Sequence, residues 1–225
     1  MLGDDTPSER TVVVPNWRLA KWFPGLKAGV GEKLKIYHSE LLRFNKATNL
    51  ISAKTANNAD LLHFADSIIG GGVILNATEA EHIYDIGSGN GFPGLVLAIM
   101  DPVRKFTLVD SDMRKLEFLK HIISSLKLTN VDVEHARVED FPEGSIECAV
   151  SRAFAPLAKA MSICSRAMKP GSCHYHFKSD SWGTEVLRIP IQIGRNWEPS
   201  LVGDYNLPGV KLKLSIVSVK KIGRK

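Results

Sequence analysis

A cluster of glycines that follows a short apolar stretch is the clearest candidate for a functional site in this sequence. Residues 85–94 read DIGSGNGFPG. Glycine lets the backbone approach a ligand closely and take a positive φ angle, and Pro93 suits the first turn of a helix. In a parallel α/β sheet, ligands bind beyond the carboxyl ends of the strands. The segment therefore predicts a cofactor site in the loop after the first core strand.

The spacing within this loop discriminates between two cofactors. A dinucleotide site carries glycine or alanine five residues after its first glycine, but here Phe92 occupies that position. Asp85 stands two residues before the first glycine, Gly87. A carboxylate there suits the ammonium group of S-adenosylmethionine (SAM) better than an anionic pyrophosphate. The spacing favours SAM, and an NAD-dependent oxidoreductase is the disfavoured alternative.

Two further strand ends carry residues that suit a nucleoside. Residues 105–110 form a predicted strand that ends in Asp110, where an acid can accept hydrogen bonds from ribose hydroxyls. The next predicted strand, residues 131–135, leads into a loop that contains Val138 and Glu139. A backbone amide and an acidic side chain in that loop can read the edge of an adenine. Three signals on three successive strand ends thus predict a nucleoside-type cofactor.

The loop after the fourth predicted strand limits the choice of methyl acceptor. Residues 151–156 read SRAFAP and contain no cysteine, so the nucleophile that pyrimidine C5 methylation requires is missing. Arg152 stays protonated and does not suit a general base. Guanine N7 has a lone pair and no proton, so its methylation needs only positioning, and we expect no catalytic acid or base. Arg152 would hold the cofactor carboxylate or read the guanine O6 edge, with a structural salt bridge as the alternative.

The elements that must position these residues alternate between strand and helix. Strands are predicted at residues 82–86, 105–110, 131–135, 146–151, 173–177 and 211–220, and helices at 92–100, 112–126 and 156–168. Residues 182–193 are ambiguous, with a helix broken near Pro190. Short alternation of this kind requires parallel strands joined by crossover helices. We therefore expect a doubly wound, Rossmann-like α/β sheet that is mostly parallel.

The first part of the chain has a different pattern. Helices are predicted at residues 15–23, 32–46 and 59–69, the last closed by the glycines at 70–72. We expect residues 1–75 to form a helical N-terminal extension and residues 76–225 to form the SAM-binding domain.

Composition excludes several classes of protein. No apolar run approaches the roughly 20 residues that span a bilayer, and the N-terminus is acidic where a signal peptide would be basic. The three cysteines are odd in number and lack metal-site spacing, which favours reduced thiols in the cytoplasm and no bound metal. The net charge of +5 permits a nucleic-acid partner. Since no heptad pattern is present, we expect a monomer without membrane contact.

Several motifs together resemble the RsmG (GidB) family of 16S ribosomal RNA guanine-N7 methyltransferases. They are the runs YDIGSGNGFPG at 84–94, LVDS at 108–111, RVE at 137–139 and SRAFA at 151–155, together with NKATNL at 45–50, His63 and DSI at 66–68. Two positions depart from the family pattern. Leu62 stands where a basic residue usually precedes the histidine, and Ser179 follows Lys178 where the family usually has glycine.

The resemblance implies a class I SAM-dependent methyltransferase fold whose substrate is one guanine in 16S rRNA, as naked RNA or within the 30S ribosomal subunit. With the residues argued above, the expected cofactor contacts are Asp85, Gly87, Ser88, Gly89, Phe92, Asp110, Ser111, Val138, Glu139 and Arg152. The expected RNA contacts are Asn45, Lys46, His63 and Lys178. A small-molecule SAM-dependent methyltransferase and a non-catalytic RNA-binding protein of the same fold remain the alternatives.

Overall fold

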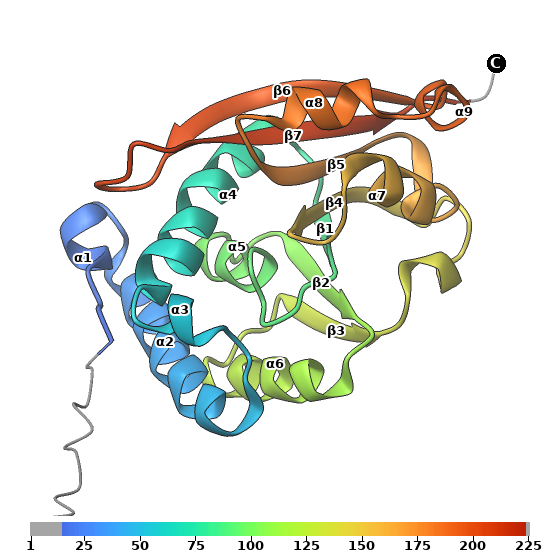
Figure 1. Cartoon of the computed structure of the whole chain (residues 1–225). Coiled ribbons are helices and arrows are strands. Elements are labelled where there is room, and N and C mark those ends of the chain that lie inside the picture. The colour runs from blue at the N-terminus through green and yellow to red at the C-terminus, as the bar shows by residue number, and fades with distance from the viewer. Residues whose placement is uncertain (1–14, 224–225) are drawn as a thin grey trace, which may run out of the picture.

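The computed structural model describes residues 15–223, and in it helices precede a sheet along the chain (Figure 1). The first part comprises α1 (Leu19–Trp22), α2 (Ala28–Thr48), α3 (Ala53–Ala56), a π-helical turn η1 (Asp60–Ala65) and α4 (Asp66–Ala77). The sheet is formed by β1 (His82–Ile86), β2 (Lys105–Asp110), β3 (Val131–His135), β4 (Ile146–Arg152), β5 (Met168–Ser179), β6 (Trp197–Asn206) and β7 (Lys213–Lys221). Between the strands lie α5 (Gly94–Met100), α6 (Met113–Ser125), a short 3-10 turn η2 (Val138–Asp140), α7 (Leu157–Cys164), α8 (Trp182–Leu187) and α9 (Ile191–Gly194).

The seven strands lie in the order β3-β2-β1-β4-β5-β7-β6. The first five run parallel, and β7 is antiparallel to both of its neighbours, β5 and β6. The predicted doubly wound, mostly parallel α/β sheet is therefore confirmed. Because β1 pairs with both β2 and β4, the strand order reverses at β1. The glycine loop follows this strand and so lies at the switch point, where such sheets bind ligands.

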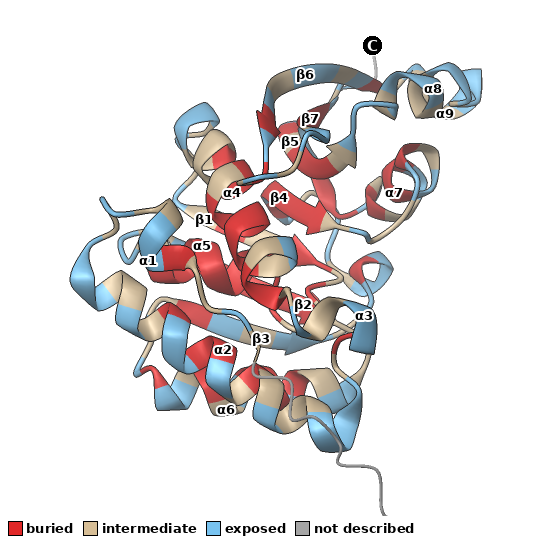
Figure 2. Cartoon of the chain, turned by 60° about the vertical axis from the view of Figure 1, so that its left-hand side comes forward, coloured by how far each residue is buried: buried red, intermediate tan, exposed pale blue. Residues whose placement is uncertain are grey.

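Helices cover both faces of the sheet, and each face has its own apolar core (Figure 2). One core joins α2, α4, α5 and α6 to the sheet, through residues such as Leu41, Ile74 and Leu119. The other lies under α7, with Leu157 and Met161. The helices before the sheet therefore share a core with it. The predicted boundary between residues 75 and 76 falls within the last turn of α4, which ends at Ala77.

The prediction that glycines 70–72 end a helix is wrong, because α4 continues through them to Ala77. Close packing explains the glycines instead. A Cβ atom on Gly70 would lie 2.4 Å from Cε1 of Phe177, and one on Gly71 would lie 2.7 Å from Cδ1 of Leu97. These positions let α4 approach β5 and α5 more closely than any side chain would allow.

Other element ends also differ from the prediction. The first helix is only the four residues of α1, whereas α2 extends to Thr48 and stops where Asn49 takes the left-handed conformation. The helix predicted at 156–168 ends at Cys164, because Met168 already belongs to β5. Pro190 breaks the ambiguous segment into α8 and α9, as predicted.

The sequence did not indicate β6. Its ten residues include Pro199 and Gly203 and lie at the edge of the sheet, where neither face is continuously buried. A strand of this kind lacks the alternation on which strand prediction relies. No helix within residues 15–223 has the length and apolar character needed to cross a membrane.

Candidate functional site

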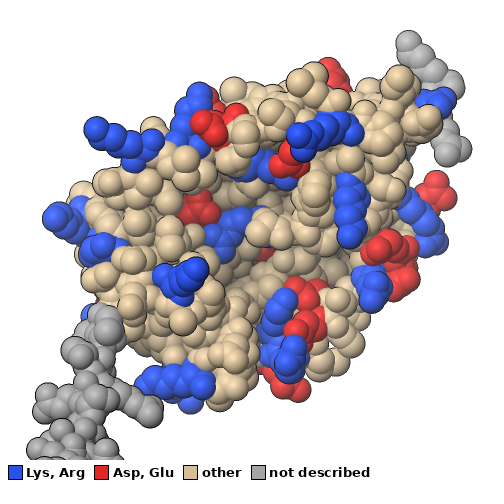
Figure 3. Space-filling view, viewed as in Figure 1, with Lys and Arg blue, Asp and Glu red and all other residues tan. Residues whose placement is uncertain are grey.

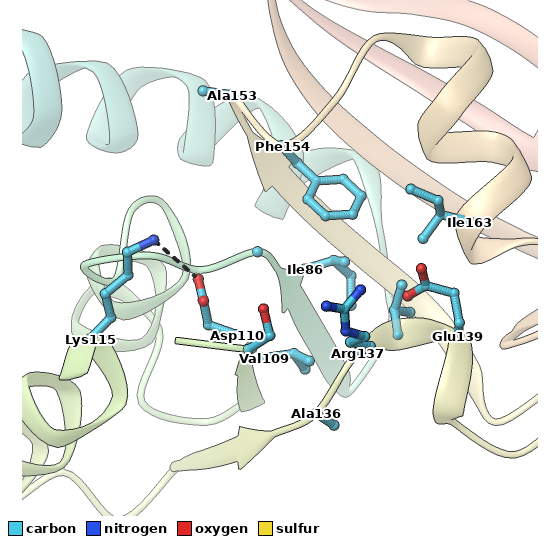
Figure 4. Close-up of a pocket in the computed structure, with 13 residues that line it drawn as sticks. Ile86, Val109, Asp110, Lys115, Ala136, Arg137, Glu139, Ala153, Phe154 and Ile163 are labelled. Atoms are coloured by element: carbon cyan, nitrogen blue, oxygen red, sulfur yellow. Dashed lines mark ion pairs between the residues drawn. The ribbon is translucent and has the colours of Figure 1, made fainter. Parts of the chain in front are cut away.

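A cavity of about 360 Å³ opens at the carboxyl ends of β1, β2 and β3 (Figure 4). It is lined by Ile86, Gly87, Val109, Asp110, Ser111, Lys115, Ala136, Arg137, Val138, Glu139, Ala153, Phe154 and Ile163. Five of the predicted cofactor contacts are among them, namely Gly87, Asp110, Ser111, Val138 and Glu139. Three separate strand ends thus converge on one cavity. The face shown in Figure 3 is hollowed near its centre, with Lys and Arg side chains and also Asp and Glu side chains around the hollow.

The floor of the cavity is the glycine loop, and the chain after β4 folds over it. Gly87 has a φ angle of 69°, and a Cβ atom there would lie 2.6 Å from Cδ2 of Phe154. Ala153 also takes a left-handed φ angle, 54°, which is uncommon for a residue other than glycine. This turn places the Phe154 ring beside the cavity, at the top of the view in Figure 4. A side chain at Gly87 would therefore displace the ring or fill the space beside it.

Asp110 is held in place by the backbone around it. Its Oδ2 accepts a hydrogen bond from Gly89 N at 2.8 Å, and its Oδ1 accepts one from Asp112 N at 2.9 Å. Lys115 approaches Oδ2 to 4.0 Å (Figure 4). A carboxylate has about four acceptor sites, so Asp110 retains capacity for further donors. Its fixed position at the cavity wall suits a pair of ribose hydroxyls.

Asp85 lies beneath the glycine loop rather than in the cavity, and it is completely buried. Its Oδ2 accepts a hydrogen bond from Gly94 N at 2.8 Å. Burial raises the pKa of this carboxyl to about 7, against smaller opposing effects of the Gly94 hydrogen bond and the Arg152 charge. Its Oδ1 has no hydrogen-bond partner among the described residues.

Unpartnered buried polar atoms gather around this loop. Besides Asp85 Oδ1, the atoms Ser88 Oγ, Asn90 Oδ1 and His63 Nε2 are buried without a partner among residues 15–223. Such atoms are rare in native proteins, and each calls for a ligand, a water or an ion. The amino acid part of SAM carries an ammonium donor and a carboxylate. The Asp85 carboxylate can accept from the ammonium and the Arg152 guanidinium can donate to the carboxylate, so the two residues fit the two ends of that group.

Arg152 ends β4 and is bound by the helical layer. Its Nη1 donates to the carbonyl of Leu62 at 2.9 Å and to Asp66 Oδ2 at 3.0 Å, and its Nη2 lies 3.0 Å from Nδ1 of His63. The guanidinium also lies 5.2 Å from the ring centre of Phe92. Arg152 therefore forms a salt bridge with Asp66 that holds it beside Phe92 of the glycine loop.

Phe92 is buried next to this arginine and does not line the cavity. Its ring stacks on Tyr37 at 5.1 Å and on His63 at 5.2 Å. The carbonyl of Asn90 accepts a hydrogen bond from the Tyr37 hydroxyl, and the side-chain amide of Asn90 donates to the carbonyl of Leu50. These contacts attach the glycine loop to α2 and to the segment after it.

The four predicted RNA contacts occupy different environments. Lys46 is exposed on α2, and Asn45 accepts a hydrogen bond from Ile51 N at 2.7 Å. His63 faces Arg152, and burial lowers its pKa to about 3, so it is neutral. Lys178 is 12% exposed and donates to Glu185 at 2.8 Å and to the carbonyl of Ala155 at 3.3 Å. Lys46 therefore retains the most freedom to meet a phosphate.

The cavity has walls that the sequence prediction did not include. Lys115, Arg137, Phe154 and Ile163 line it without having been assigned to the cofactor. Arg137 and Phe154 stand within the motifs at 137–139 and 151–155, which also contain the expected cofactor contacts Val138 and Arg152. Lys115 lies on α6 and Ile163 on α7, four and eight residues beyond the motifs at 108–111 and 151–155, and no sequence signal identifies them.

Solved structures with the same architecture include methyltransferases. The structure is similar to the precorrin-6y C5,15-methyltransferase of Geobacter metallireducens, with a TM-score of 0.51, 12% identity and coverage of 78% of this chain and 92% of that one. It is also similar to a SAM-dependent methyltransferase of Aquifex aeolicus, with a TM-score of 0.50, 16% identity and coverage of 67% and 88%. The architecture is that of class I SAM-dependent methyltransferases.

Closer relatives cover nearly the whole chain. The ribosomal RNA small subunit methyltransferase G 3 of Bdellovibrio bacteriovorus is 44% identical over 215 residues, which is 95% of this chain and 97% of that protein. The ribosomal RNA small subunit methyltransferase G of Escherichia fergusonii is 31% identical and covers 84% of this chain and 87% of its own. The model of the GidB family, rRNA small subunit methyltransferase G, matches residues 31–193. With its cavity, its glycine loop and these relatives, the chain belongs to the GidB family of rRNA small subunit methyltransferases.

Proposed function

We propose that this protein transfers a methyl group from SAM to N7 of one guanine in 16S rRNA. The observation that carries the proposal is the identity and setting of Arg152. A guanidinium fixed by Asp66 and His63 stands at the strand end where other base methyltransferases place a nucleophile or a base. The relatives named for rRNA methylation support the choice of an RNA acceptor.

The cofactor would be shared between the cavity and the glycine loop. Asp110 and Ser111 would bind the ribose, and Val138 and Glu139 would bind the adenine. The backbone of residues 87–89 would pass beneath the sugar and sulfur. Asp85 has a carboxyl oxygen that is unpartnered among residues 15–223 and Arg152 is a cation, so they would bind the ammonium and the carboxylate of the amino acid part.

The residues of this chain would then act by positioning alone. SAM supplies a methyl group on a cationic sulfur. Guanine N7 presents a lone pair and loses no proton at this position, so no side chain has to act as a base. Holding the two reactants in line is by itself a large source of rate acceleration. The neutral His63 and the permanently charged Arg152 suit this role, because neither has to change its protonation state.

We further propose that Asn45, Lys46, His63 and Lys178 lie on the side from which the RNA approaches. The partner would be 16S rRNA or the 30S subunit, the protein would act as a monomer, and the reaction would take place in the cytoplasm. The target base has to leave its stack to reach the methyl group, as it does for other enzymes that modify bases. The departures at Leu62 and Ser179 stand next to His63 and Lys178 in the sequence, and they would bear on which nucleotide is selected.

The experiment is to map N7-methylguanine in 16S rRNA from cells with and without the protein, and to repeat the mapping after complementation with the Arg152→Ala variant. We expect one methylated guanine to disappear and to return only with the unchanged protein. In vitro, labelled SAM should transfer label to 16S rRNA or 30S subunits. Retention of every N7-methylguanine in the deletion strain would refute the proposal. Label found only in a small metabolite would favour a small-molecule methyltransferase, and SAM binding without any turnover would favour an RNA-binding protein.

A further inference from the structure

Tyr205 connects the edge of the sheet to the arginine of the site. It lies on β6, outside the region that the family model matches. Its hydroxyl donates to Asp66 Oδ1 at 2.6 Å, and the other carboxylate oxygen of Asp66 accepts from Arg152 at 3.0 Å. Both Tyr205 and Asp66 are more than 90% buried. One carboxylate thus bridges a phenol and a guanidinium away from bulk water.

The bridge fixes a group that would otherwise rotate. The terminal torsion of an aspartate is broad, so a single hydrogen bond does not hold both oxygens. With Tyr205 on Oδ1, Oδ2 is directed at Arg152. Burial and the Asp66 carboxylate raise the pKa of Tyr205, so the phenol remains protonated and donates.

The orientation of Asp66 affects which hydrogen-bond donors of Arg152 remain available for a ligand. A guanidinium has five N–H donors. Leu62, Asp66 and His63 use both donors on Nη1 and one on Nη2. Within residues 15–223, nothing accepts a hydrogen bond from Nε or from the second Nη2 hydrogen. Two donors on one guanidinium suit a single carboxylate, which binds arginine in bidentate fashion.

We propose that Tyr205 is a positioning residue that acts through Asp66 to aim these two free donors of Arg152 at the carboxylate of SAM. The inference rests on the proposed function, because it takes Arg152 to bind the cofactor. The competing role for Tyr205 is purely structural, since its hydrogen bond also joins β6 to α4. A structural role would affect every ligand equally, whereas a positioning role would affect only ligands that carry the carboxylate.

The test compares two ligands by calorimetry. S-adenosylhomocysteine contains the amino acid group, and methylthioadenosine lacks it. We expect Tyr205→Phe to weaken S-adenosylhomocysteine binding about 5- to 10-fold and to leave methylthioadenosine binding unchanged. In an Arg152→Ala background, Tyr205→Phe should have no further effect on either ligand, because the residue through which it acts is gone. Such non-additivity is the signature of coupled residues.

A matched control is Ser200→Ala. It removes a hydrogen bond of 2.8 Å between Ser200 on β6 and Ser218 on β7, without touching Asp66. We expect this variant to bind both ligands as the unchanged protein does. Circular dichroism and the thermal midpoint would establish that each variant is folded.

Three results would overturn the inference. The first is that Tyr205→Phe lowers the affinity for both ligands equally. The second is that S-adenosylhomocysteine binding is unchanged in Tyr205→Phe or in Arg152→Ala. The third is that Tyr205→Phe causes a further loss of affinity in the Arg152→Ala background. Failure of the proposed function would look different. The affinities of the variants could then follow the expected pattern while the N7-methylguanines of 16S rRNA stay the same with and without the protein, or, if SAM is not the cofactor, the unchanged protein itself would bind neither ligand.

Discussion

Asp85 combines complete burial with a carboxyl group that has only one hydrogen-bond donor among the described residues. Burial raises its pKa to about 7 in the folded protein, compared with about 3.9 in an unfolded chain. Between these two values the folded state retains a proton that the unfolded state has lost. Stability therefore falls as the pH rises through this window.

We expect the Asp85→Asn variant to lack this dependence. Relative to that variant, the unchanged protein without cofactor should lose about 1–3 kcal/mol of unfolding free energy between pH 5 and pH 8. Urea denaturation of both proteins at the two pH values measures the difference, and taking the difference cancels the titration of all other groups. A difference that stays constant with pH would contradict the burial of an ionisable carboxyl at this position.

Gly87 is constrained both by the Phe154 ring beside it and by its positive φ angle. We expect Gly87→Ala to reduce SAM affinity at least tenfold, which corresponds to about 1.4 kcal/mol, because the new Cβ atom pushes the Phe154 ring into the cavity. The control is Gly87→Ala in a Phe154→Ala background, which keeps the positive φ angle at residue 87 but has no Phe154 ring for the Cβ atom to displace. If calorimetry shows that Gly87→Ala lowers SAM affinity by the same factor in both backgrounds, strain rather than lost space explains the effect.

At the scale of elements, α4 is distinguished by three consecutive glycines within a buried helix. Gly71→Ala should destabilise the protein by about 1–3 kcal/mol, because its Cβ atom would overlap Leu97 of α5. Gly72→Ala should stabilise it by roughly 0.5–1 kcal/mol, because nothing lies within 4 Å and alanine favours the helix. Urea denaturation of the pair tests this. Two variants that shift stability in the same direction would argue against close packing on one side of α4.

The elements of the parallel sheet could be predicted from the sequence because each is a short apolar run bounded by turn residues. All five parallel strands, β1 to β5, were found. The glycines of α4 misled the prediction, since a pattern cannot distinguish a glycine that ends a helix from one that allows close packing. The strand β6 was missed because its edge position removes the need for regular alternation.

In the candidate site, too, some features could be predicted from the sequence and others could not. Gly87, Asp110 and Glu139 could be placed on one cavity because the carboxyl ends of parallel strands meet at one edge. The contacts of Arg152 with η1 and α4 could not, because they depend on how a helical layer packs on the sheet. That packing joins residues more than 80 positions apart, and no local signal encodes it.

For the whole molecule, the shared core has a consequence for unfolding. Because α2 and α4 contribute to the same core as the sheet, residues 15–223 should unfold in one transition. The tryptophans provide a test, since Trp17 and Trp22 lie in the helical layer while Trp182 and Trp197 lie near α8 and β6. A variant with Trp17→Phe and Trp22→Phe and one with Trp182→Phe and Trp197→Phe should give the same midpoint by fluorescence. Earlier loss of the signal from Trp17 and Trp22 would mean that the helical layer unfolds separately.

The hydrogen bond between Asp66 and Tyr205 joins residues 139 positions apart in the chain. This separation affects when the bond can form during synthesis of the protein. A protein is made from its N-terminus, so Asp66 and Arg152 emerge well before Tyr205 does. Contacts of such long range form late, since closing them requires most of the chain to be present. Until β6 emerges, a nascent chain would hold Asp66 without the Tyr205 hydrogen bond that directs its other oxygen at Arg152. The order of synthesis would thus keep an unfinished chain from binding its cofactor tightly while it is still attached to a ribosome.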